Sequence, residues 1–254
     1  MKYCSDLTVK AVERINEKYV LLRLTQEDPL PKMQPGQFVE VRVDDSPNTF
    51  LRRPISINDV DRVNNELHLL VAVVGDGTRH LAQLTAGSKL NVMYPLGNGF
   101  NVTSVQSRLL VGGGVGVAPL LYLGRTISEM GGKPTFLLGA RTKHDLLLLD
   151  KFKMYGEVYV TTEDGSEGER GFVTDHTIWQ KQKFSLVSTC GPMPMMKAVA
   201  RLSASLDTEC ELSLENKMAC GLGACLCCVE KTNDKGNVCV CTEGPVFDAK
   251  RLTL

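Results

Sequence analysis

The stretch that decides the fold is Arg108-Leu109-Leu110-Val111-Gly112-Gly113-Gly114-Val115-Gly116-Val117-Ala118-Pro119. It begins as an apolar strand, passes through a glycine-rich turn and continues into a helix, with a proline in the first helical turn, where no amide donor is needed. Small residues let a pyrophosphate group approach the backbone of such a turn, and free amides at the start of the helix favour an anion. The strict G-x-G-x-x-G pattern is absent, so a tight turn without a ligand is the alternative interpretation.

Downstream of this turn, strands and helices alternate. We expect strands at 107–111, 135–139, 158–162 and 185–190, and helices at 119–130, 146–155, 174–180 and 193–206. This alternation predicts a parallel sheet covered by helices. Ligands bind such sheets at the carboxyl ends of the strands, so the junction Cys190-Gly191-Pro192 is expected to face the same crevice as the glycine-rich turn. A small buried residue without a ligand is the alternative interpretation of Cys190.

Upstream of the turn, the chain is a series of short strands. We expect these strands at 6–12, 19–24, 38–43, 55–60 and 67–74, with one short helix at 78–84. Many short strands separated by regular turn signals predict a small antiparallel β-barrel. The strand-rich pattern ends at Pro95-Leu96-Gly97-Asn98-Gly99-Phe100, so we expect a domain boundary near residue 100.

A cysteine cluster dominates the last part of the chain. Six of the nine cysteines lie between Cys220 and Cys241. Among them, Cys220, Cys225 and Cys228 form C-x4-C-x2-C, which is the spacing of a plant-type [2Fe–2S] loop. Two glycines inside the loop permit positive-φ backbone that brings amides towards the sulfur atoms. Such amides also tune the reduction potential of a cluster.

Other interpretations of the cysteines remain open. The fourth cluster ligand is either Cys239 or Cys241. Cys225-x2-Cys228 with Cys239-x-Cys241 is alternatively a zinc site, although the second pair is one residue short of the common spacing. Buried thiols without a metal are a third interpretation. A secreted disulfide scaffold is excluded, because such a chain is short and spreads its cysteines along its length.

The chain is accordingly predicted to be an α+β protein with several domains. Residues 1–100 form an antiparallel β-barrel domain, and residues 101–208 form an α/β domain with a parallel sheet. Residues 209–254 form a small module organised around a metal rather than around a hydrophobic core. The length of 254 residues is about twice that of a usual domain, which leaves room for a small third module.

The composition excludes several classes of protein. The 29 lysines and arginines balance 29 aspartates and glutamates, without a long basic run. This balance argues against a nucleic acid or an anionic membrane surface as the main partner. The N-terminus lacks the apolar core of a signal peptide, and the longest apolar stretches are too short to span a bilayer. We therefore expect a soluble protein of the cytoplasm, where cysteines stay reduced.

Two further motifs lie in the barrel half, Arg53-Pro54-Ile55-Ser56 and Gly75-Asp76-Gly77-Thr78. Taken alone, Arg53 is as well explained by a solvated surface charge as by a ligand contact. The second motif, taken alone, is more often a hairpin turn than a binding segment. In their order along the chain, these motifs, the glycine-rich turn and the cysteine module together resemble the ferredoxin–NADP reductase superfamily. Within it, they resemble the family of electron-transfer subunits of NAD-dependent dihydroorotate dehydrogenase B.

This resemblance implies an FAD cofactor on the barrel. Arg53 would pair with the FAD pyrophosphate, and Ser56 would reach the flavin. Backbone and hydroxyl groups of the second motif would bind the same cofactor, and a neighbouring strand would line the site. The implied FAD-binding residues are Arg53, Pro54, Ile55, Ser56, Leu70, Val71, Ala72, Gly77 and Thr78.

The resemblance also implies an NAD site and a complete set of cluster ligands. In this family the last cluster cysteine precedes a Gly-Pro-Val-Phe segment, as Cys241 precedes residues 244–247 here, which leaves Cys227 and Cys239 as extra thiols. The implied cluster ligands are Cys220, Cys225, Cys228 and Cys241. The implied NAD-binding residues are Gly112, Gly113, Gly114 and Gly116 at the pyrophosphate, Cys190 and Gly191 near the nicotinamide, and a loop formed by 163–166 and 171–174.

Finally, the resemblance implies a partner subunit. Dihydroorotate would be oxidised at FMN in a catalytic subunit, and its electrons would pass through the cluster and FAD to NAD+, in pyrimidine biosynthesis. The assembly is expected to be a heterotetramer. No catalytic residue is expected in this chain, because hydride transfer between stacked rings needs no protein base and the four histidines are scattered. A flavin suits this route because it exchanges one or two electrons.

Two other functions share part of this pattern. A redox subunit of a sulfide dehydrogenase, a ferredoxin:NADP oxidoreductase or a hydrogenase would carry the same cofactor motifs with a different partner. A zinc-stabilised binding protein with a degenerate flavin domain is the alternative from another class. The residues also do not distinguish NAD from NADP. Arg141 and Lys143 could bind the 2′-phosphate of NADP, but they could equally be solvated surface charges.

Overall fold

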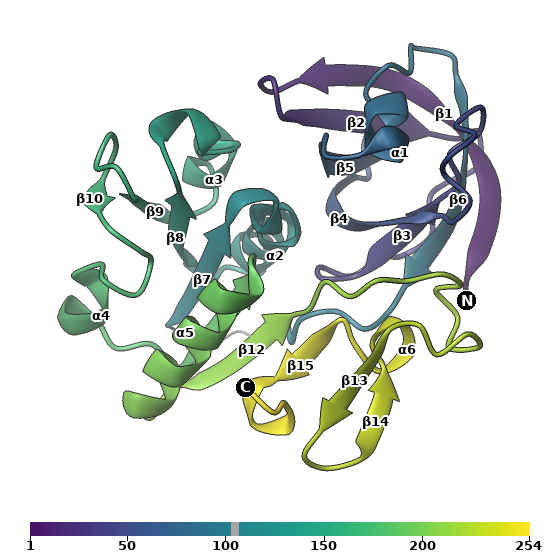
Figure 1. The fold of residues 1–254 in the computed structure, drawn as a ribbon. Coiled ribbons are helices and arrows are strands. Elements are labelled where there is room, and N and C mark those ends of the chain that lie inside the picture. Colours follow the sequence, from purple (N-terminus) through teal and green to yellow (C-terminus); the bar gives the residue numbers. More distant parts are fainter. Residues whose placement is uncertain (103–106) are drawn as a thin grey trace. The chain divides into compact units, whose positions relative to one another are not determined.

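The computed structural model describes residues 1–102 and 107–254, and its fold is shown in Figure 1. The chain divides into two compact units. The first contains Met1–Gly99, Glu215–Glu230 and Cys239–Pro245, and the second contains Phe100–Leu214, Lys231–Val238 and Val246–Leu254. Residues beyond 214 therefore contribute to both units. The division into three domains stays a prediction.

The first unit is built on a closed barrel of antiparallel strands in the order β1-β2-β5-β4-β3-β6. This confirms the predicted antiparallel barrel. The short helix after β5 begins two residues earlier than expected. The elements are β1 (Tyr3–Arg14), β2 (Tyr19–Thr25), β3 (Phe38–Val41), β4 (Arg53–Asp61), β5 (Glu66–Ala72), α1 (Asp76–Leu81) and β6 (Lys89–Leu96).

Strand β6 was not among the expected strands, although it closes the barrel by pairing with both β1 and β3. Leu90, Val92, Tyr94 and Leu96 are buried along it, and less buried residues alternate with the first three of them. This period of two is a strand signal. It is obscured by Pro95, a residue that weakens the prediction of any strand because it lacks an amide donor.

The second unit is built on a seven-stranded sheet in the order β10-β9-β8-β7-β11-β12-β15. Every neighbouring pair is parallel except β12 and β15, which confirms the predicted parallel sheet. Strand β12 begins where the sequence predicted the start of a separate module. The strands are β7 (Arg108–Gly113), β8 (Thr135–Ala140), β9 (Glu157–Thr162), β10 (Glu169–Arg170), β11 (Leu186–Cys190), β12 (Glu209–Ser213) and β15 (Val246–Asp248).

Two helices of this unit are shorter than the sequence predicted. The helix expected at 146–155 is reduced to α3, because Leu148 directly before it has a φ of 57° and cannot be helical. The helix expected at 174–180 begins late, because Glu169 accepts hydrogen bonds from the amide and hydroxyl of Thr177 and holds that segment in a turn. The helical segments are η1 (Gly114–Val117), α2 (Ala118–Glu129), η2 (Lys143–Asp145), α3 (Leu149–Lys153), α4 (Ile178–Lys181), α5 (Met193–Ser205) and η3 (Ala249–Arg251).

A buried polar network ties three strands of this sheet together. The Arg108 guanidinium on β7 forms an ion pair with Glu211 on β12 and donates a 2.9 Å hydrogen bond to Ser188 on β11. The Ser188 hydroxyl in turn donates to Glu211 over 2.7 Å. Burial raises the pKa of Glu211 and lowers the pKa of Arg108, so each charge depends on the other to remain ionised.

The C-terminal part adds a hairpin and a short helix. The hairpin is formed by β13 (Val229–Thr232) and β14 (Gly236–Cys239), and α6 (Val240–Glu243) follows directly and carries Cys241. Within residues 1–102 and 107–254, no helix is both long enough and apolar enough to cross a bilayer.

Candidate functional site

The predicted cluster cysteines come together in the first unit. Cys220, Cys225 and Cys228 lie in an irregular loop, and Cys241 lies in α6. The thiols interact in pairs, Cys220 with Cys225 and Cys228 with Cys241. In the described part of the chain, no three His, Cys, Asp or Glu side chains surround one single-ion position. Paired thiols suit a two-iron cluster, in which four thiolates are shared between two irons.

Backbone amides point at three of these sulfur atoms. Leu222 N lies 3.3 Å from Cys220 Sγ, Gly223 N lies 3.2 Å from Cys241 Sγ, and Cys241 N lies 3.4 Å from Cys228 Sγ. The expected glycine conformations are present, with φ of 66° at Gly221 and 84° at Gly223. Amide donors stabilise thiolates, so the loop suits sulfur atoms that carry negative charge.

The electrostatics of the two pairs differ. Amide donors, that of Leu222 above all, lower the pKa of the Cys220 thiol to about 6. Burial, reinforced by the neighbouring Cys228, raises the pKa of the Cys241 thiol to about 12. A bound metal would lower the pKa of this thiol, because a coordinating thiol is deprotonated by the ion.

The two extra thiols have different surroundings. Cys239 also lies within hydrogen-bonding range of Cys228 and is partly exposed, whereas Cys241 is buried and accepts the Gly223 amide. Cys227 is exposed. Both candidates for the fourth ligand therefore adjoin the same thiol, and the amide contact is the feature that separates them.

The three segments expected to bind FAD lie together in the first unit. Arg53–Ser56 begin β4, which pairs with β5, and Leu70–Ala72 end β5. Gly77 on α1 faces the start of β4, because a Cβ built on it would lie 3.3 Å from Arg53 Cδ and 2.9 Å from Thr49 Cγ2. Only glycine fits at this contact without displacing a neighbour, so the chain brings its backbone close to the arginine there.

The Thr78 hydroxyl is used locally. It accepts hydrogen bonds from Val74 N at 2.9 Å and Gly75 N at 3.0 Å, and it donates to the Gly75 carbonyl. These bonds hold the turn before α1. The family resemblance implied a hydroxyl group that binds the cofactor, whereas the structure shows this hydroxyl bonded within the segment that carries Gly77.

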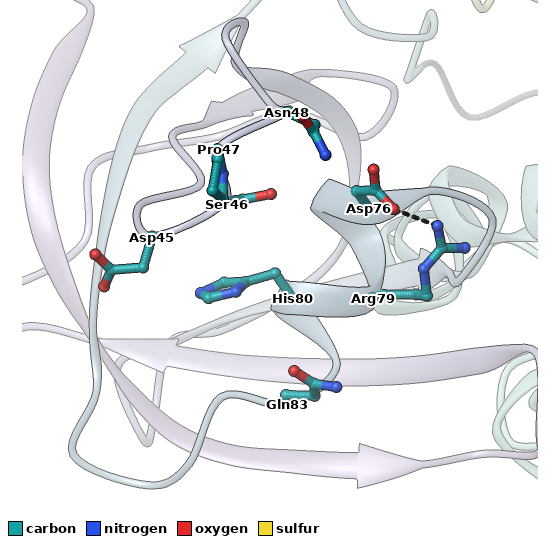
Figure 2. Close-up of a pocket in the computed structure, with 8 residues that line it drawn as sticks. All are labelled: Asp45, Ser46, Pro47, Asn48, Asp76, Arg79, His80 and Gln83. Carbon is teal, nitrogen blue, oxygen red and sulfur yellow. Dashed lines mark hydrogen bonds and ion pairs between the residues drawn. The ribbon is translucent and has the colours of Figure 1, made fainter.

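A pocket of about 270 Å³ opens beside this turn (Figure 2). It is lined by residues 45–48 and by Asp76, Arg79, His80 and Gln83. Figure 2 shows the ion pair between Asp76 and Arg79 at one side of the pocket. The lining is polar, and a hydrogen bond of 2.8 Å between the hydroxyls of Ser46 and Thr49 connects it to the contact at Gly77. None of the residues at 45–48 was singled out from the sequence.

Glu40 is a second residue that the sequence did not reveal. It lies on β3, its residue is 0% exposed, and in residues 1–102 and 107–254 neither carboxyl oxygen has a hydrogen-bond partner. Burial raises the pKa of Glu40 to about 7, while the charges of Arg52 and Arg53 oppose that rise. A charged residue between the apolar residues of Phe38–Val41 was the available signal.

The predicted dinucleotide turn has the conformation expected of it. β7 leads into η1 and then into α2, with a proline in the first turn of α2. Gly114 has a φ of 55°. A Cβ on Gly112 would lie 2.9 Å from Val117 Cγ1, and one on Gly113 would lie 2.5 Å from Met195 Sδ. Small residues are therefore required by the packing of the turn itself.

The second predicted junction meets the first. Cys190 on β11 is the register partner of Gly112 on β7, at the carboxyl ends of neighbouring parallel strands. The chain proceeds from β7 to β8 on one side, and β11 lies on the other side, so this is the topological switch point where ligands bind. A Cβ on Gly116 would lie 2.5 Å from Gly191 Cα. Cys190 itself is 0% exposed.

The loops that follow β8 and β9 also join at this edge. Lys143 N donates a 2.8 Å hydrogen bond to Ser166 Oγ, and Asp164 N donates a 3.3 Å bond to the Arg141 carbonyl. Both basic side chains are exposed. The structure therefore leaves them available to a nucleotide without marking them as different from other surface charges.

Two parts of the chain match known families. Residues 215–253 match the iron–sulfur cluster binding domain of dihydroorotate dehydrogenase B, and residues 110–201 match the oxidoreductase NAD-binding domain.

Similar proteins extend over nearly the whole chain. The dihydroorotate dehydrogenase B (NAD(+)) electron transfer subunit of Fusobacterium nucleatum is 42% identical over 228 residues, which cover 87% of each chain. The subunit of Bacillus velezensis is 39% identical over 255 residues, which cover 98% of this chain and 99% of the relative. A chain in the structure of an NADH-dependent reduced ferredoxin–NADP oxidoreductase has a TM-score of 0.88 and 29% identity, over 97% of this chain and 89% of that one.

Proposed function

This chain belongs to the family of dihydroorotate dehydrogenase B electron transfer subunits, and we propose how its residues divide the work of that subunit. It is an oxidoreductase subunit with FAD and a [2Fe–2S] cluster. It passes electrons from a catalytic partner subunit to NAD+ in pyrimidine biosynthesis. The observation that carries this function is the 39% identity to such a subunit over 98% of the chain.

The cluster is assigned to Cys220, Cys225, Cys228 and Cys241. The pairing of their thiols and the three amide donors support this set. Cys241 is preferred to Cys239 because the Gly223 amide points at its sulfur. When bound, the cluster exchanges single electrons, whereas FAD exchanges one or two and so links the cluster to a nicotinamide.

FAD is assigned to the face formed by β4, β5 and the start of α1. Arg53 supplies positive charge for the pyrophosphate, and the absence of a side chain at Gly77 lets the cofactor approach the backbone beside it. The polar pocket next to Gly77 suits the hydroxyls and ring nitrogens of the adenosine end. The proposed FAD-binding residues are Arg53, Pro54, Ile55, Ser56, Leu70, Val71, Ala72, Gly77 and Thr78.

NAD is assigned to the switch point between β7 and β11. The glycines of the turn before α2 let the pyrophosphate approach the backbone at the start of a twelve-residue helix. Residues 190 and 191 hold the end of β11 against that turn. The proposed NAD-binding residues are Gly112, Gly113, Gly114, Gly116, Cys190 and Gly191.

The catalytic partner is proposed to carry FMN and to form a heterotetramer with this chain in the cytoplasm. Neither a membrane nor a nucleic acid is part of this proposal. The balance of 29 basic and 29 acidic residues supports it, because an excess of basic residues is what usually attracts a protein to a nucleic acid or an anionic membrane.

The deciding test is NAD+ reduction driven by dihydroorotate. Tagged protein is purified from its native cells, so that its partners are purified with it, and NADH formation is followed with NADP+ as the comparison acceptor. Activity with NAD+, in a preparation that contains an FMN subunit, is the expected result. The assignment would be overturned by a complex that shows flavin and iron–sulfur absorbance but forms no NADH when dihydroorotate is added.

One observation favours a second candidate. The structural similarity to a chain of the ferredoxin–NADP oxidoreductase is high, with a TM-score of 0.88. The identity of 29% is lower than the 39–42% shared with the dihydroorotate dehydrogenase subunits, which is why that function comes second. Reduced ferredoxin in place of dihydroorotate, in the same assay, separates the two.

A further inference from the structure

The end of strand β6 contacts both segments that carry the proposed cluster ligands. Leu96 is the last residue of β6, and its Cδ1 would lie 3.0 Å from a Cβ built on Gly221, the residue after Cys220. Gly97 follows, and a Cβ built on it would lie 2.5 Å from Pro245 Cδ and 2.8 Å from the Gly244 carbonyl oxygen. All of these residues belong to the first unit.

Asn98 completes the contact with three hydrogen bonds of its own. Its backbone amide donates a 2.7 Å hydrogen bond to the Gly244 carbonyl. Its side-chain amide donates to the carbonyls of Thr242 at 2.9 Å and Glu243 at 3.1 Å. A parallel β-bridge pairs Asn98 with Pro245. The segment held in this way begins at the residue after Cys241.

The turn is itself fixed to the barrel. Gly97 has a φ of 72°, which only glycine adopts readily. The Gln37 side chain donates a 2.9 Å hydrogen bond to the Gly97 carbonyl, and it accepts a 2.7 Å bond from Gln34 N. Gln37 directly precedes β3, the strand beside β6.

Strand β3 supports the other side of the cluster loop. A Cβ on Gly221 would lie 2.9 Å from Glu40 Cγ, in addition to its contact with Leu96. Gly221, one residue after the first cysteine, therefore contacts two adjacent barrel strands, whereas the residue after Cys241 contacts Asn98, which follows β6. β3 also pairs with β4, the strand that begins at Arg53.

We propose that the turn Leu96-Gly97-Asn98 positions the [2Fe–2S] cluster on the flavin barrel, with Asn98 holding the segment that carries the fourth ligand. The inference rests on the proposed function, because it takes the four cysteines as ligands and the barrel as the FAD site. Electron exchange between two groups slows steeply as their separation grows. A turn that fixes the cluster to the barrel therefore sets the rate of exchange without touching either cofactor.

The test compares Asn98→Ala with wild-type protein in the complete complex. Asn98 is exposed, so its truncation removes two hydrogen bonds without opening the core. Stopped-flow mixing with NADH follows bleaching of FAD and then reduction of the cluster. We expect FAD to be reduced at the wild-type rate. The cluster is expected to be reduced at least roughly tenfold more slowly than in wild type, because misplaced reacting groups react more slowly. Asn64→Ala is the matched control, because Asn64 is an exposed turn residue whose side chain donates a hydrogen bond to nearby Asp61, far from the cysteines in the sequence.

A second variant, Gly97→Ala, and a second measurement, the rate of iron release, test the same contact independently. In Gly97→Ala the new methyl group would collide with Pro245 and Gly244, and with Phe38 on β3, so this variant is expected to slow reduction of the cluster in the same way. Iron release to a chelator is measured in both variants and is expected to speed up while FAD is retained. This readout requires only a bound cluster, so it stands even if wild-type cluster proves not to accept electrons from NADH, which would instead contradict the proposed function.

Two results would overturn the inference. One is a wild-type rate of cluster reduction and of iron release in both variants. The other is joint loss of FAD and iron, which would mean that the turn stabilises the fold in general. Slower cluster reduction with unchanged FAD and an altered electron paramagnetic resonance spectrum of the reduced cluster supports it.

Discussion

Gly116 packs so closely against Gly191 that a Cβ on Gly116 would lie 2.5 Å from Gly191 Cα. Gly116→Ala therefore has to separate the two turns at the switch point. We expect the KM for NADH in an NADH-to-dye assay to rise about tenfold or more, because the proposed pyrophosphate site is displaced. Gly131→Asn is the control, since Gly131 has open space around it and asparagine tolerates its positive φ. An unchanged KM in Gly116→Ala would show that this turn does not contact NADH.

Cys225→Ser tests the cluster separately from the flavin. Replacing one proposed thiolate by a hydroxyl weakens iron binding, because iron–sulfur clusters prefer thiolate ligands. We expect dihydroorotate-driven NAD+ reduction to be lost and direct NADH-to-dye activity to survive. Cys227→Ser is the control, since Cys227 is an exposed neighbour outside the proposed ligand set. If Cys225→Ser keeps both activities, the cluster does not lie on the electron path.

Arg53→Ala tests the flavin site. Loss of the guanidinium removes the proposed partner of the FAD pyrophosphate, and charge-assisted bonds of this kind are the stronger ones. We expect a clear drop in flavin content after extensive dialysis, measured by absorbance of the released FAD. Arg42→Ala is the control, because Arg42 is exposed and pairs with Asp44 instead. Equal flavin retention in the two variants would remove Arg53 from this role.

Glu66 makes the barrel sensitive to acid. Its side chain is 0% exposed and pairs with Arg23 at 2.7 Å and Lys10 at 2.6 Å. Arg23, opposed by burial and aided by Lys10, lowers the pKa of Glu66 from 4.5 to about 2. A lowered pKa in the folded state means that this contribution is complete above about pH 4.5 and is lost as the pH falls through about 2.

We therefore expect Glu66→Gln to lower the free energy of unfolding by about 3 kcal/mol at pH 7, with the difference shrinking below pH 4.5. Urea unfolding at several pH values measures it. Glu13→Gln is the matched control, because Glu13 pairs with the same arginine at the surface and is expected to cost less than about 1 kcal/mol. A difference between Glu66→Gln and wild type that does not vary with pH would contradict the assignment.

The pair Arg108 and Glu211 stabilises the other unit. Glu211→Leu leaves a buried guanidinium without its counter-charge, which costs about 3–5 kcal/mol. Adding Arg108→Met removes the stranded charge, so the double variant is expected to recover most of that loss. Urea unfolding of the single and double variants measures the coupling. A double variant less stable than Glu211→Leu would mean that the arginine acts through Ser188 or Asn101 rather than through the glutamate.

The sequence was sufficient for the parts of the fold that depend on local pattern. The glycine-rich turn at 112–116 and the alternation after it predicted the parallel sheet, and the rule for carboxyl ends of strands brought Cys190 beside Gly112. Strand β6 was not predicted, because Pro95 interrupts its alternation of buried and less buried residues. Strand β12 was not predicted, because the chain that follows it is rich in glycine and cysteine.

The candidate site was predictable only where a motif marks it. The spacing of Cys220, Cys225 and Cys228 predicted a cluster loop, and the structure has amide donors at the sulfur atoms of Cys220, Cys228 and Cys241, while the ligand set itself stays a prediction. Glu40 is marked only by its charge between apolar residues, and Asn98 by no motif, because both act through contacts with residues more than a hundred positions away. The assignments of FAD and NAD to individual residues stay predictions until binding is measured.

The crossing of the C-terminal residues between the two units has a consequence for biosynthesis. Each unit contains segments from both before and after residue 214. A nascent chain that has emerged only to that point therefore lacks parts of both, so neither unit reaches its final form early in translation. The proposed cluster ligands lie on both sides of the β13–β14 hairpin, so they too are complete only after the hairpin has been synthesised. All strands of the barrel lie within residues 3–96, so the barrel is synthesised before the segment that contains Cys220–Cys241.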